Sequence, residues 1–395
     1  MYKLIFIAVI IWVPLSSSFA QGWQSVNSGT TSYLMAVSMP NDSTGYIVGY
    51  SGTILKTRDG GYSWSKQVSG THNAMHSVYF IDENTGYAAG EYGTILKTTN
   101  GGAEWQDISP GISEALLSIH FPDPLSGFAS GGAFISTSDG GNSWPFYQEH
   151  HDDWFKCVHF LNKYQGFAAT YSGLILRTVN GGQDWYLMNN TARMINAIFF
   201  LDDSTGYAVG ENVYNQALIM KTNDRGATWI SQHFVFSWAL SSVHFPNRDT
   251  GYAVGSNGMI FKTVNGGQSW TDLWYETPQW LNAVAFTDGN HGIIAATGGL
   301  ILKTENGGEM GIDELSGSTL HLSIYPNPVR DILNIHLPRH DSSMITIYDI
   351  HGIEKIREFV SEGQPSIDIS RLPSGIYLVC LIMNDVRLIG RFVKA

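Results

Sequence analysis

The side chains best suited to ligand binding are aromatic residues that stand between short apolar runs, several of them with carboxylates nearby in the chain. A flat aromatic face can stack on a sugar ring or on an extended peptide, and a neighbouring acid can accept a hydrogen bond from either. Some of these rings could instead pack between neighbouring repeats, so they are candidates and not a defined site. The candidates are Tyr92, Trp154, Tyr171, Tyr214, Trp238, Trp274 and Trp280.

Carboxylates in the same segments raise the alternative of glycosidic bond hydrolysis. That chemistry needs an acid and a second carboxylate held about 5 to 10 Å apart. Nothing in the spacing of the acids selects two of them, so no catalytic residue is predicted. The carboxylates available are Glu91, Glu149, Asp152, Asp153, Glu211 and Glu276.

Histidines and aspartates offer possible metal ligands in two places. The run 150–153, His-His-Asp-Asp, has suitable residue types, yet four adjacent residues seldom converge on one ion without further partners. His120, His159 and His244 recur at one position of the segments SIHF, CVHF and SVHF, where other repeats place Tyr79 or a phenylalanine. Because aromatic rings substitute for imidazole there, we expect packing, and we predict no metal site and no cofactor.

One short turn occurs seven times and must position the segments between its copies. It reads Thr, x, Asp or Asn, x, Gly, x, x, Trp, and we call it the repeated turn. The Asp or Asn can accept hydrogen bonds from nearby backbone N–H groups, glycine tolerates positive φ, and the tryptophan can fold back over apolar surface. The copies begin at Thr57, Thr98, Thr137, Thr178, Thr222, Thr263 and Thr304, which are 39 to 44 residues apart.

A fixed period of about 40 residues with several strand-like runs per unit is typical of a β-propeller. Four strands make one blade, and neighbouring blades must stack to bury the faces that a single blade leaves open. In the second unit the four runs lie at 75–81, 86–89, 94–98 and 105–108. The sequence therefore predicts an all-β chain in which each unit forms one blade.

The two ends of the repeat region complement each other. The seventh turn has Gly311 where tryptophan stands in the other copies, whereas the chain near its start has Trp23 in a segment that resembles 64–70. We therefore expect a seven-bladed β-propeller over residues 21–311, whose last blade takes its outermost strand from the N-terminal segment. Such closure removes the open sheet edges that invite aggregation.

The repeated turn resembles the Asp-box, or bacterial neuraminidase repeat. The longer unit, SVxF, TGYAVG, GxILKT and NGGxxW, resembles the propeller of the photosystem II assembly and stability factor family, over roughly residues 23–310. The resemblance implies that these turns are structural and lie away from any active site. The structural residues that it implies are Asp59, Trp64, Asn100, Trp105, Asp139, Trp144, Asn180, Trp185, Asp224, Trp229, Asn265, Trp270, Asn306 and Trp23.

Asp-boxes also occur in sialidases and propeller glucanases, so an extracellular glycoside hydrolase is the alternative function. A sialidase-like site needs three arginines that converge on a carboxylate, together with a tyrosine nucleophile. Three of the five propeller arginines lie in or beside repeated turns, which leaves Arg193 and Arg248. We therefore favour a non-enzymatic binding or scaffold module whose ligand is an unknown extracellular glycan or protein.

The charge of the repeat region bears on the kind of partner that it can bind. Residues 21–310 hold 13 basic and 24 acidic side chains, which argues against nucleic acid as a partner because phosphate contacts need clustered Lys and Arg.

Residues 1–20 read as a signal peptide, with the apolar run 4–13 and small residues Ser18 and Ala20 before the cleavage point. The apolar run is shorter than the roughly 20 residues that a membrane anchor needs.

A second pattern follows the propeller. Residues 312–320 have the Gly, Ser and acidic character of a linker, and the strand-like runs of 321–395 indicate a small β-sandwich. The segments YPNPVRDILNI, ITIYDIHG, IDISRLPSGIYLV and RFVKA resemble the type A C-terminal sorting domain of the type IX secretion system. The resemblance implies that the type IX machinery handles residues 321–395, and that the processed protein is secreted or held on the outer cell surface. We expect it to be a monomer.

Overall fold

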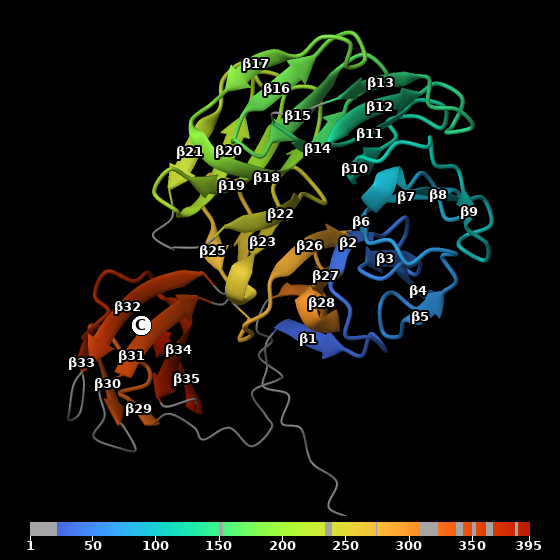
Figure 1. Ribbon diagram of the computed structural model, residues 1–395. Helices are drawn as coiled ribbons and strands as arrows, with labels where there is room; N and C mark the ends of the chain where they lie inside the picture. Colours follow the sequence, from blue (N-terminus) through green and yellow to red (C-terminus); the bar gives the residue numbers. More distant parts are fainter. Residues whose placement is uncertain are drawn as a thin grey trace, which may run out of the picture.

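The computed structural model describes residues 22–149, 153–233, 239–273, 275–308, 323–336, 343–349, 353–360, 366–383 and 386–395. Within these ranges the chain is all-β, as predicted, and its helical segments are three short 3₁₀ turns. Figure 1 shows the strands of residues 22–308 arranged as a ring of small sheets, with a separate group of strands from the C-terminal residues. Among the described residues, no helix has the length and hydrophobicity that a membrane crossing requires.

Seven four-stranded antiparallel sheets make up the described part of residues 22–308, and we call them blades 1 to 7. Blades 1 to 3 are β2 Leu34–Ser38, β3 Gly45–Gly49, β4 Thr53–Thr57 and β5 Ser65–Gln67; β6 Met75–Phe80, β7 Gly86–Gly90, β8 Ile95–Thr98 and β9 Gln106–Asp107; β10 Leu116–His120, β11 Gly127–Gly131, β12 Ala133–Thr137 and β13 Phe146–Glu149. Blade 4 is β14 Phe155–Phe160, β15 Gly166–Thr170, β16 Ile175–Thr178 and β17 Tyr186–Asn189.

Blades 5 to 7 continue this order, except that the last blade is completed from the N-terminal end. They are β18 Ala192–Phe200, β19 Gly206–Asn212, β20 Ala217–Thr222 and β21 Ile230–His233; β22 Leu240–His244, β23 Gly251–Gly255, β24 Ile260–Thr263 and β25 Thr271–Asp272; β26 Leu281–Phe286, β27 Gly292–Ala296, β28 Ile301–Gly308 and β1 Gly22–Val26. The 3₁₀ turns η1 Glu91–Gly93, η2 Ser256–Gly258 and η3 Thr297–Gly299 join the second and third strands of blades 2, 6 and 7.

The first strand of each blade lines the inside of the ring. These strands contact one another in the cycle β2, β6, β10, β14, β18, β22, β26 and back to β2. Each of them shifts register near its start, as β6 does between Met75 and Ser77, and such bulges add the twist that a curved sheet needs. The second strand of every blade is buried throughout, because blades cover both of its faces.

Six of the seven junctions between blades contain the same aromatic stack. At the first of them, Phe80 lies flat on Tyr46 of the preceding blade with 3.6 Å between ring centroids, and Trp105 meets Phe80 edge-on at 5.9 Å. The corresponding flat pairs at the other five junctions lie 3.5 to 4.0 Å apart. The tryptophan of the repeated turn therefore covers a phenylalanine that also fixes the neighbouring blade.

The N-terminal strand closes blade 7 in the way that the sequence predicts. Strand β1 pairs antiparallel with β28, and Trp23, only 3% exposed, meets Phe286 edge-on at 5.7 Å, as the tryptophans of other blades meet their phenylalanines. Ser28 Oγ donates to the carbonyl of Thr30 at 3.0 Å, a bond that recurs after the first repeated turn. Gly299 has a φ of 75°, and a Cβ there would lie 1.9 Å from the carbonyl oxygen of Thr30, so only glycine fits beneath the N-terminal segment.

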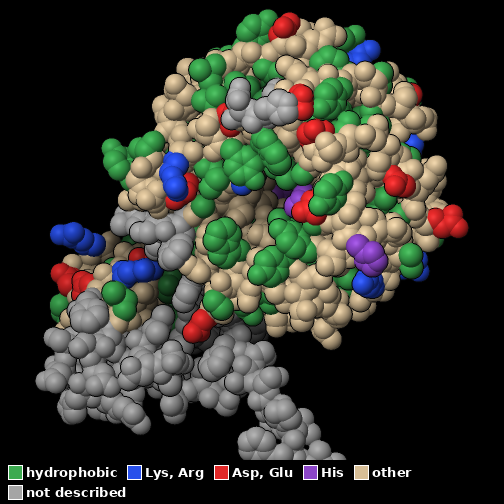
Figure 2. Space-filling view, viewed as in Figure 1, with side chains coloured by type: hydrophobic (Ala, Val, Ile, Leu, Met, Phe, Trp, Pro, Cys, Tyr) green, Lys and Arg blue, Asp and Glu red, His purple; other side chains and the backbone are tan. Residues whose placement is uncertain are grey.

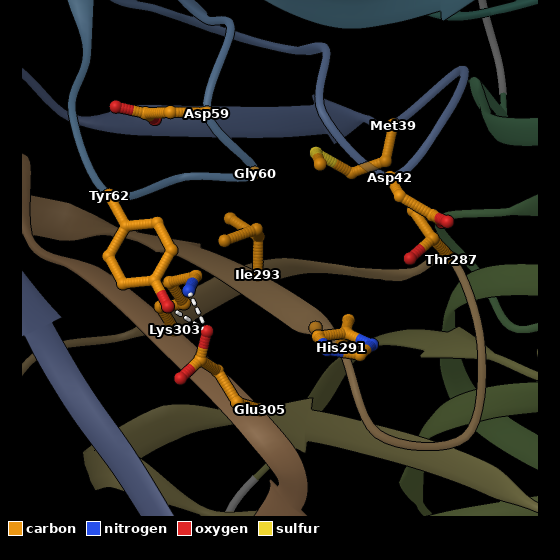
Figure 3. A pocket seen from close by; sticks show the side chains of 11 residues that line it. Met39, Asp42, Asp59, Gly60, Tyr62, Thr287, His291, Ile293, Lys303 and Glu305 are labelled. Carbon is orange, nitrogen blue, oxygen red and sulfur yellow. Dashed lines mark hydrogen bonds and ion pairs between the residues drawn. The ribbon is translucent and has the colours of Figure 1, made fainter.

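The junction between blades 7 and 1 lacks the aromatic stack. Ile293 and Met39 stand where the tyrosine and the phenylalanine stand elsewhere, and a cavity of about 210 Å³ opens beside them (Figure 3). Lys303 turns toward Glu305, with 2.7 Å between Nζ and Oε1, and lies 3.1 Å from the centre of the Tyr62 ring. The Tyr62 hydroxyl donates to the same carboxylate. The closing junction is thus polar at its rim and loosely filled inside.

Filling this junction should stabilise the propeller. In the variant Met39→Phe/Ile293→Tyr, the new rings can stack, and the tyrosine hydroxyl can reach a turn carbonyl, as Tyr87 reaches that of Gly140 at 2.9 Å. We expect the free energy of unfolding to rise by about 1 kcal/mol. Thermal unfolding measures this, with Met39→Leu as the control that adds no ring. A double variant that melts at or below the wild-type temperature would show that the missing aromatic stack does not weaken this junction.

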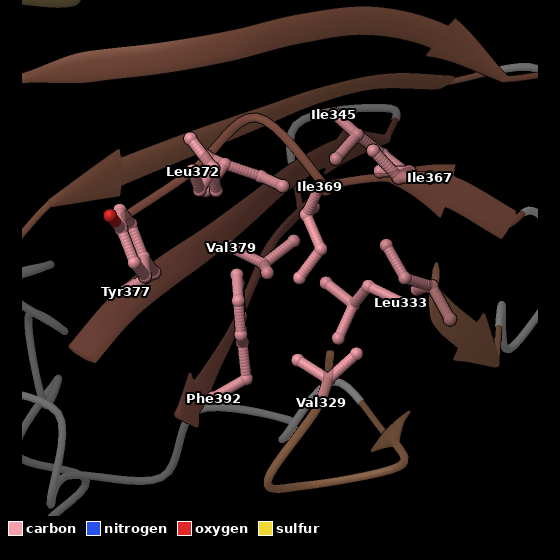
Figure 4. Close-up of a cluster of buried hydrophobic side chains, with 11 residues drawn as sticks. Val329, Leu333, Ile345, Ile367, Ile369, Leu372, Tyr377, Val379 and Phe392 are labelled. Atoms are coloured by element: carbon pink, nitrogen blue, oxygen red, sulfur yellow. The ribbon is translucent and has the colours of Figure 1, made fainter. Parts of the chain in front are cut away.

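The C-terminal strands form two further sheets. Figure 4 shows the buried side chains between them, among which Leu333, Ile345 and Val379 are fully buried. Of these seven strands, β32 was not expected from the sequence, because its segment EKIREFV is largely charged. The predicted linker 312–320 lies outside the described residues. The strands are β29 Ser323–Tyr325, β30 Ile332–His336 and β33 Ser366–Asp368 in one sheet, and β32 Glu354–Val360, β31 Ser343–Asp349, β34 Gly375–Met383 and β35 Val386–Lys394 in the other.

Candidate functional site

The repeated turns use their own polar atoms internally. In the first turn Thr57 Oγ1 donates to Asp59 Oδ1 at 2.7 Å and accepts from the N–H of Gly61 at 2.9 Å, while the N–H of Ser63 donates to Asp59 Oδ1 at 2.9 Å. The threonine bonds recur in all seven turns. Since these oxygens already have partners, the geometry supports a structural role for the turns.

The aspartates of three turns make stability depend on acid. Hydrogen bonds from the Ser63 and Ser143 side chains hold the pKa of Asp59 and Asp139 at about 2, and Thr228 likewise lowers the pKa of Asp224. A carboxylate with a depressed folded-state pKa stabilises the fold above its unfolded pKa of about 4, and this contribution is lost as the pH falls toward 2.

Because asparagine occupies this place in the other four turns, the triple Asp→Asn variant at positions 59, 139 and 224 should fold normally at neutral pH. It should lose less stability than the wild type as the pH falls from about 4 to 2, since it lacks the three carboxylates that titrate there. Melting temperatures recorded across that range test this. Parallel loss of stability in both proteins would show that other groups control acid unfolding.

The two ends of the propeller carry different connections. The repeated turns join the third and fourth strands of each blade. They lie at the same end of the propeller as the connections between first and second strands. The opposite end carries the connections between second and third strands and those that lead into the next blade. We call it the recognition end. Figure 2 shows hydrophobic side chains there around the central hollow, with a histidine and acidic side chains among them.

The candidate aromatic residues that the structure describes all lie at the recognition end. Tyr92, Trp154, Tyr171, Tyr214 and Trp280 are between 37% and 76% exposed. Each lies either in a connection between the second and third strands of a blade or directly before the first strand of a blade. The other two candidates, Trp238 and Trp274, lie outside the described residues.

Sequence reasoning missed Tyr33 as a member of this group. Its ring lies 5.5 Å from that of Tyr50, which in turn meets His76 edge-on at 6.1 Å. The missed signal was positional, because Tyr33 directly precedes a first strand, as Trp154 and Trp280 do. The aromatic surface therefore extends onto blade 1.

Tyr92 and Trp154 face a common pocket of about 400 Å³. Glu91 and Glu114 also line it, and Gly132 lies between the two sides, where a Cβ would come within 3.2 Å of the Trp154 ring and 3.3 Å of the Glu114 side chain. These residues come from blades 2 and 3 and from the segment that enters blade 4. The structure thus joins two aromatic candidates and one candidate carboxylate, and it adds Glu114, which the sequence did not single out.

Two parts of the chain match known protein families. Residues 15–111 and 186–278 match the family model of the photosynthesis system II assembly factor YCF48, and residues 323–395 match that of the secretion system C-terminal sorting domain. The propeller is YCF48-like, and a type IX sorting domain follows it. No curated protein sequence matches the chain.

Solved structures agree with this description of the YCF48-like propeller. The structure described as YCF48 bound to D1 peptide and that of YCF48 from Cyanidioschyzon merolae are each 20% identical, with TM-scores of 0.61. They cover 72% of this chain, and 96% and 98% of their own chains are matched. The WD40 β-propeller domain of Doa1 is 12% identical with a TM-score of 0.57, and 74% and 98% of the two chains are covered. These likenesses show the fold alone.

Lys156, on the first strand of blade 4, lies beside one of the aromatic candidates of the YCF48-like propeller. Its Nζ donates to Asn196 Oδ1 at 2.8 Å and lies 4.7 Å from the centre of the Tyr171 ring. Burial lowers the pKa of Lys156, and it also lowers the pKa of His76 against the opposing effect of Glu91. Lys156 is therefore already engaged by its own neighbours.

The recurring histidines of the YCF48-like propeller pack among aromatic rings of neighbouring blades, His244 against Phe199 at 5.2 Å. The His120 ring lies 4.9 Å from that of Tyr79 and 4.7 Å from that of His159. Burial lowers the pKa of His159 and His244 to about 4, so both are neutral at physiological pH. Among the described residues, no cluster of three or more His, Cys, Asp or Glu could hold a metal. Residues 150–152 of the His-His-Asp-Asp run lie outside the described ranges.

The arginines do not converge. Arg193 pairs with Glu211 at 2.6 Å at the recognition end, whereas Arg248 pairs with Asp202 at 2.7 Å at the end with the repeated turns. The other three propeller arginines lie in or next to repeated turns. Since all five arginines are described, the triad that a sialidase-like site needs is not assembled in this YCF48-like propeller.

Proposed function

We propose that this chain is a secreted or cell-surface propeller that binds an extracellular glycan or protein at the recognition end and catalyses no reaction. The observation that carries the proposal is the set of exposed aromatic rings around the central hollow. Exposed apolar surface gathered in one place costs free energy in water and marks interaction sites. Aromatic rings with nearby carboxylates suit sugars and extended peptides, both of which combine flat apolar faces with hydrogen-bond donors.

A hydrolase is supported less well by the same end of the molecule. Glu211 is committed to Arg193, and Glu114 accepts hydrogen bonds from the N–H and the hydroxyl of Ser113 at 3.1 and 3.0 Å. Asp153 accepts from the N–H of Ser172 at 3.1 Å and from its hydroxyl. Carboxylates that hold loops in this way fit a rigid binding surface better than an acid and nucleophile pair.

Export and the related solved structures support the extracellular binding role. The sorting domain implies export to the surface or the medium. The propeller described as YCF48 bound to D1 peptide shows that a ring of this fold can hold a peptide, which makes a peptide segment one candidate ligand here. A sequence identity of 20% does not transfer that partner, so the ligand must be found directly.

Binding should depend on the aromatic rings. We expect the mature chain to retain a ligand on glycan or peptide arrays, and Trp154→Ala or Trp280→Ala to weaken that binding about tenfold, since one stacked ring contributes about 1 to 2 kcal/mol. Tyr186→Ala, which removes an equally exposed ring from the outer strand β17, is the matched control. If the control weakens binding as much as the two tryptophan variants do, the site lies elsewhere.

A further inference from the structure

The pocket between Tyr92 and Trp154 has a composition that selects among ligands. Its described side chains include two exposed aromatic rings and the carboxylates of Glu91 and Glu114, and no basic side chain is among them. Two described cations of the recognition end have partners of their own: Lys156 donates to Asn196, and Arg193 pairs with Glu211. The pocket therefore presents negative charge and aromatic faces together.

Tyr92 holds a backbone conformation that a bulky side chain rarely adopts. Its φ is 55° and its ψ 39°, in the left-handed region. The same place in three other blades is taken by Ser51, Asn257 and Gly298, also with positive φ. A tyrosine here is unfavourable for the local backbone and leaves its ring 69% exposed, so folding does not account for it. Strained residues of this kind occur at ligand sites, where the side chain serves the ligand.

We propose that this pocket binds a basic side chain, arginine or lysine, of a peptide segment from a partner protein, an inference that rests on the proposed binding function. A guanidinium or ammonium group inserted between Tyr92 and Trp154 gains cation–π attraction from both rings. Glu91 and Glu114 neutralise its charge and accept its N–H donors. The volume of about 400 Å³ admits such a side chain together with its neighbouring backbone.

The acidic surroundings favour this occupant over a neutral sugar. The Tyr147 hydroxyl lies among Glu114 and Glu149, and its pKa is raised first by burial and then by these two charges. The propeller as a whole carries an excess of acid, with 24 acidic and 13 basic side chains in residues 21–310. A positively charged segment is thus drawn to the propeller before contact, and the attraction should weaken as ionic strength rises.

Ligand-observed NMR with small probes tests the assignment on the full mature chain. The probes are Nα-acetyl-arginine amide and Nα-acetyl-lysine amide, with the neutral isostere Nα-acetyl-citrulline amide and methyl glucoside as comparisons. We expect the two cations to bind in a salt-dependent manner and the neutral probes to bind at least about tenfold more weakly, a difference that the loss of one charge-assisted contact supplies.

Variants then locate the probe. Tyr92→Asn suits the left-handed backbone, so it should leave the melting temperature unchanged or higher while weakening arginine binding about tenfold. Glu91→Gln/Glu114→Gln should also weaken arginine binding about tenfold, and it should remove the salt dependence of that binding. Glu104→Gln, at an exposed position of a repeated turn, should leave arginine binding unchanged. If citrulline or methyl glucoside binds as well as arginine, or Tyr92→Asn leaves arginine binding intact, the cation assignment is wrong and the proposed function still stands. If the arrays yield no ligand of any class, the proposed function itself fails.

Discussion

Deleting residues 22–29 should destroy the stability of the propeller. The deletion removes strand β1, leaves β28 with an unpaired edge, and takes Trp23 from its buried contact with Phe286. Loss of a buried tryptophan side chain alone costs about 3 to 5 kcal/mol, which is a large share of the 5 to 15 kcal/mol that stabilise a typical domain. We expect aggregation, or a melting temperature lower by 10 °C or more at roughly 2 to 4 °C per kcal/mol.

Two point variants separate the contribution of the Trp23 indole to stability from that of the rest of strand β1. Trp23→Ala should reproduce most of the loss, because the indole is 3% exposed, whereas Gln24→Ala, in the same strand with an exposed side chain, should change stability by less than about 0.5 kcal/mol. Thermal unfolding and size-exclusion chromatography measure both effects. A deletion variant that stays monomeric with an unchanged melting temperature would show that the ring closes in another way.

Removing residues 321–395 should abolish export across the outer membrane while leaving the propeller folded. Our reason is that these residues have their own core, in which Leu333, Ile345 and Val379 are fully buried, and domains with separate cores fold separately. In a host that has a type IX system, the truncated chain should accumulate in the periplasm. The exported wild-type protein should end near residues 312–320 when its mass is measured.

A point variant can show that the folded sorting domain is what the machinery needs. Leu333→Asp places a charge at a fully buried position and should unfold this domain, so it should block export as the truncation does. Glu358→Gln, at an exposed position of β32, is the control and should be exported normally. Efficient secretion of the truncated chain would overturn the sorting role of these residues.

The fold could be predicted because its determinants are local and repeated. The threonine, Asp or Asn and glycine of each turn make the same bonds seven times, and a spacing of about 40 residues leaves room for four strands. Trp23 was placed correctly because the sequence shows both that the seventh turn lacks its tryptophan and that a tryptophan stands near the start of the chain. Strand β32 was missed because edge strands can be charged on their exposed face, which hides the apolar alternation.

The site could be predicted only in outline. The sequence places aromatic residues in the connections of one end, but which of them share a pocket depends on blade positions that are far apart in the chain. Tyr92 and Trp154 are 62 residues apart and line one pocket, whereas Tyr214 and Trp280 stand on blades 5 and 7. Glu114 was missed because it is the single carboxylate of the segment 108–115. The Tyr92 backbone conformation is indicated only indirectly, by Asn257 and Gly298 at the same place of other repeats.

We propose that the recognition end binds its ligand without cleaving it. This proposal is tested most directly by incubating the mature chain with each array-identified ligand and with a panel of polysaccharides, while binding and product release are followed in the same samples. We expect retention of the ligand by the wild type, weaker retention by Trp154→Ala, and no release of reducing ends or peptide fragments. Cleavage of a sugar polymer that Glu91→Gln, Glu149→Gln, Glu211→Gln or Glu276→Gln abolishes without weakening binding would contradict the proposal and establish the hydrolase.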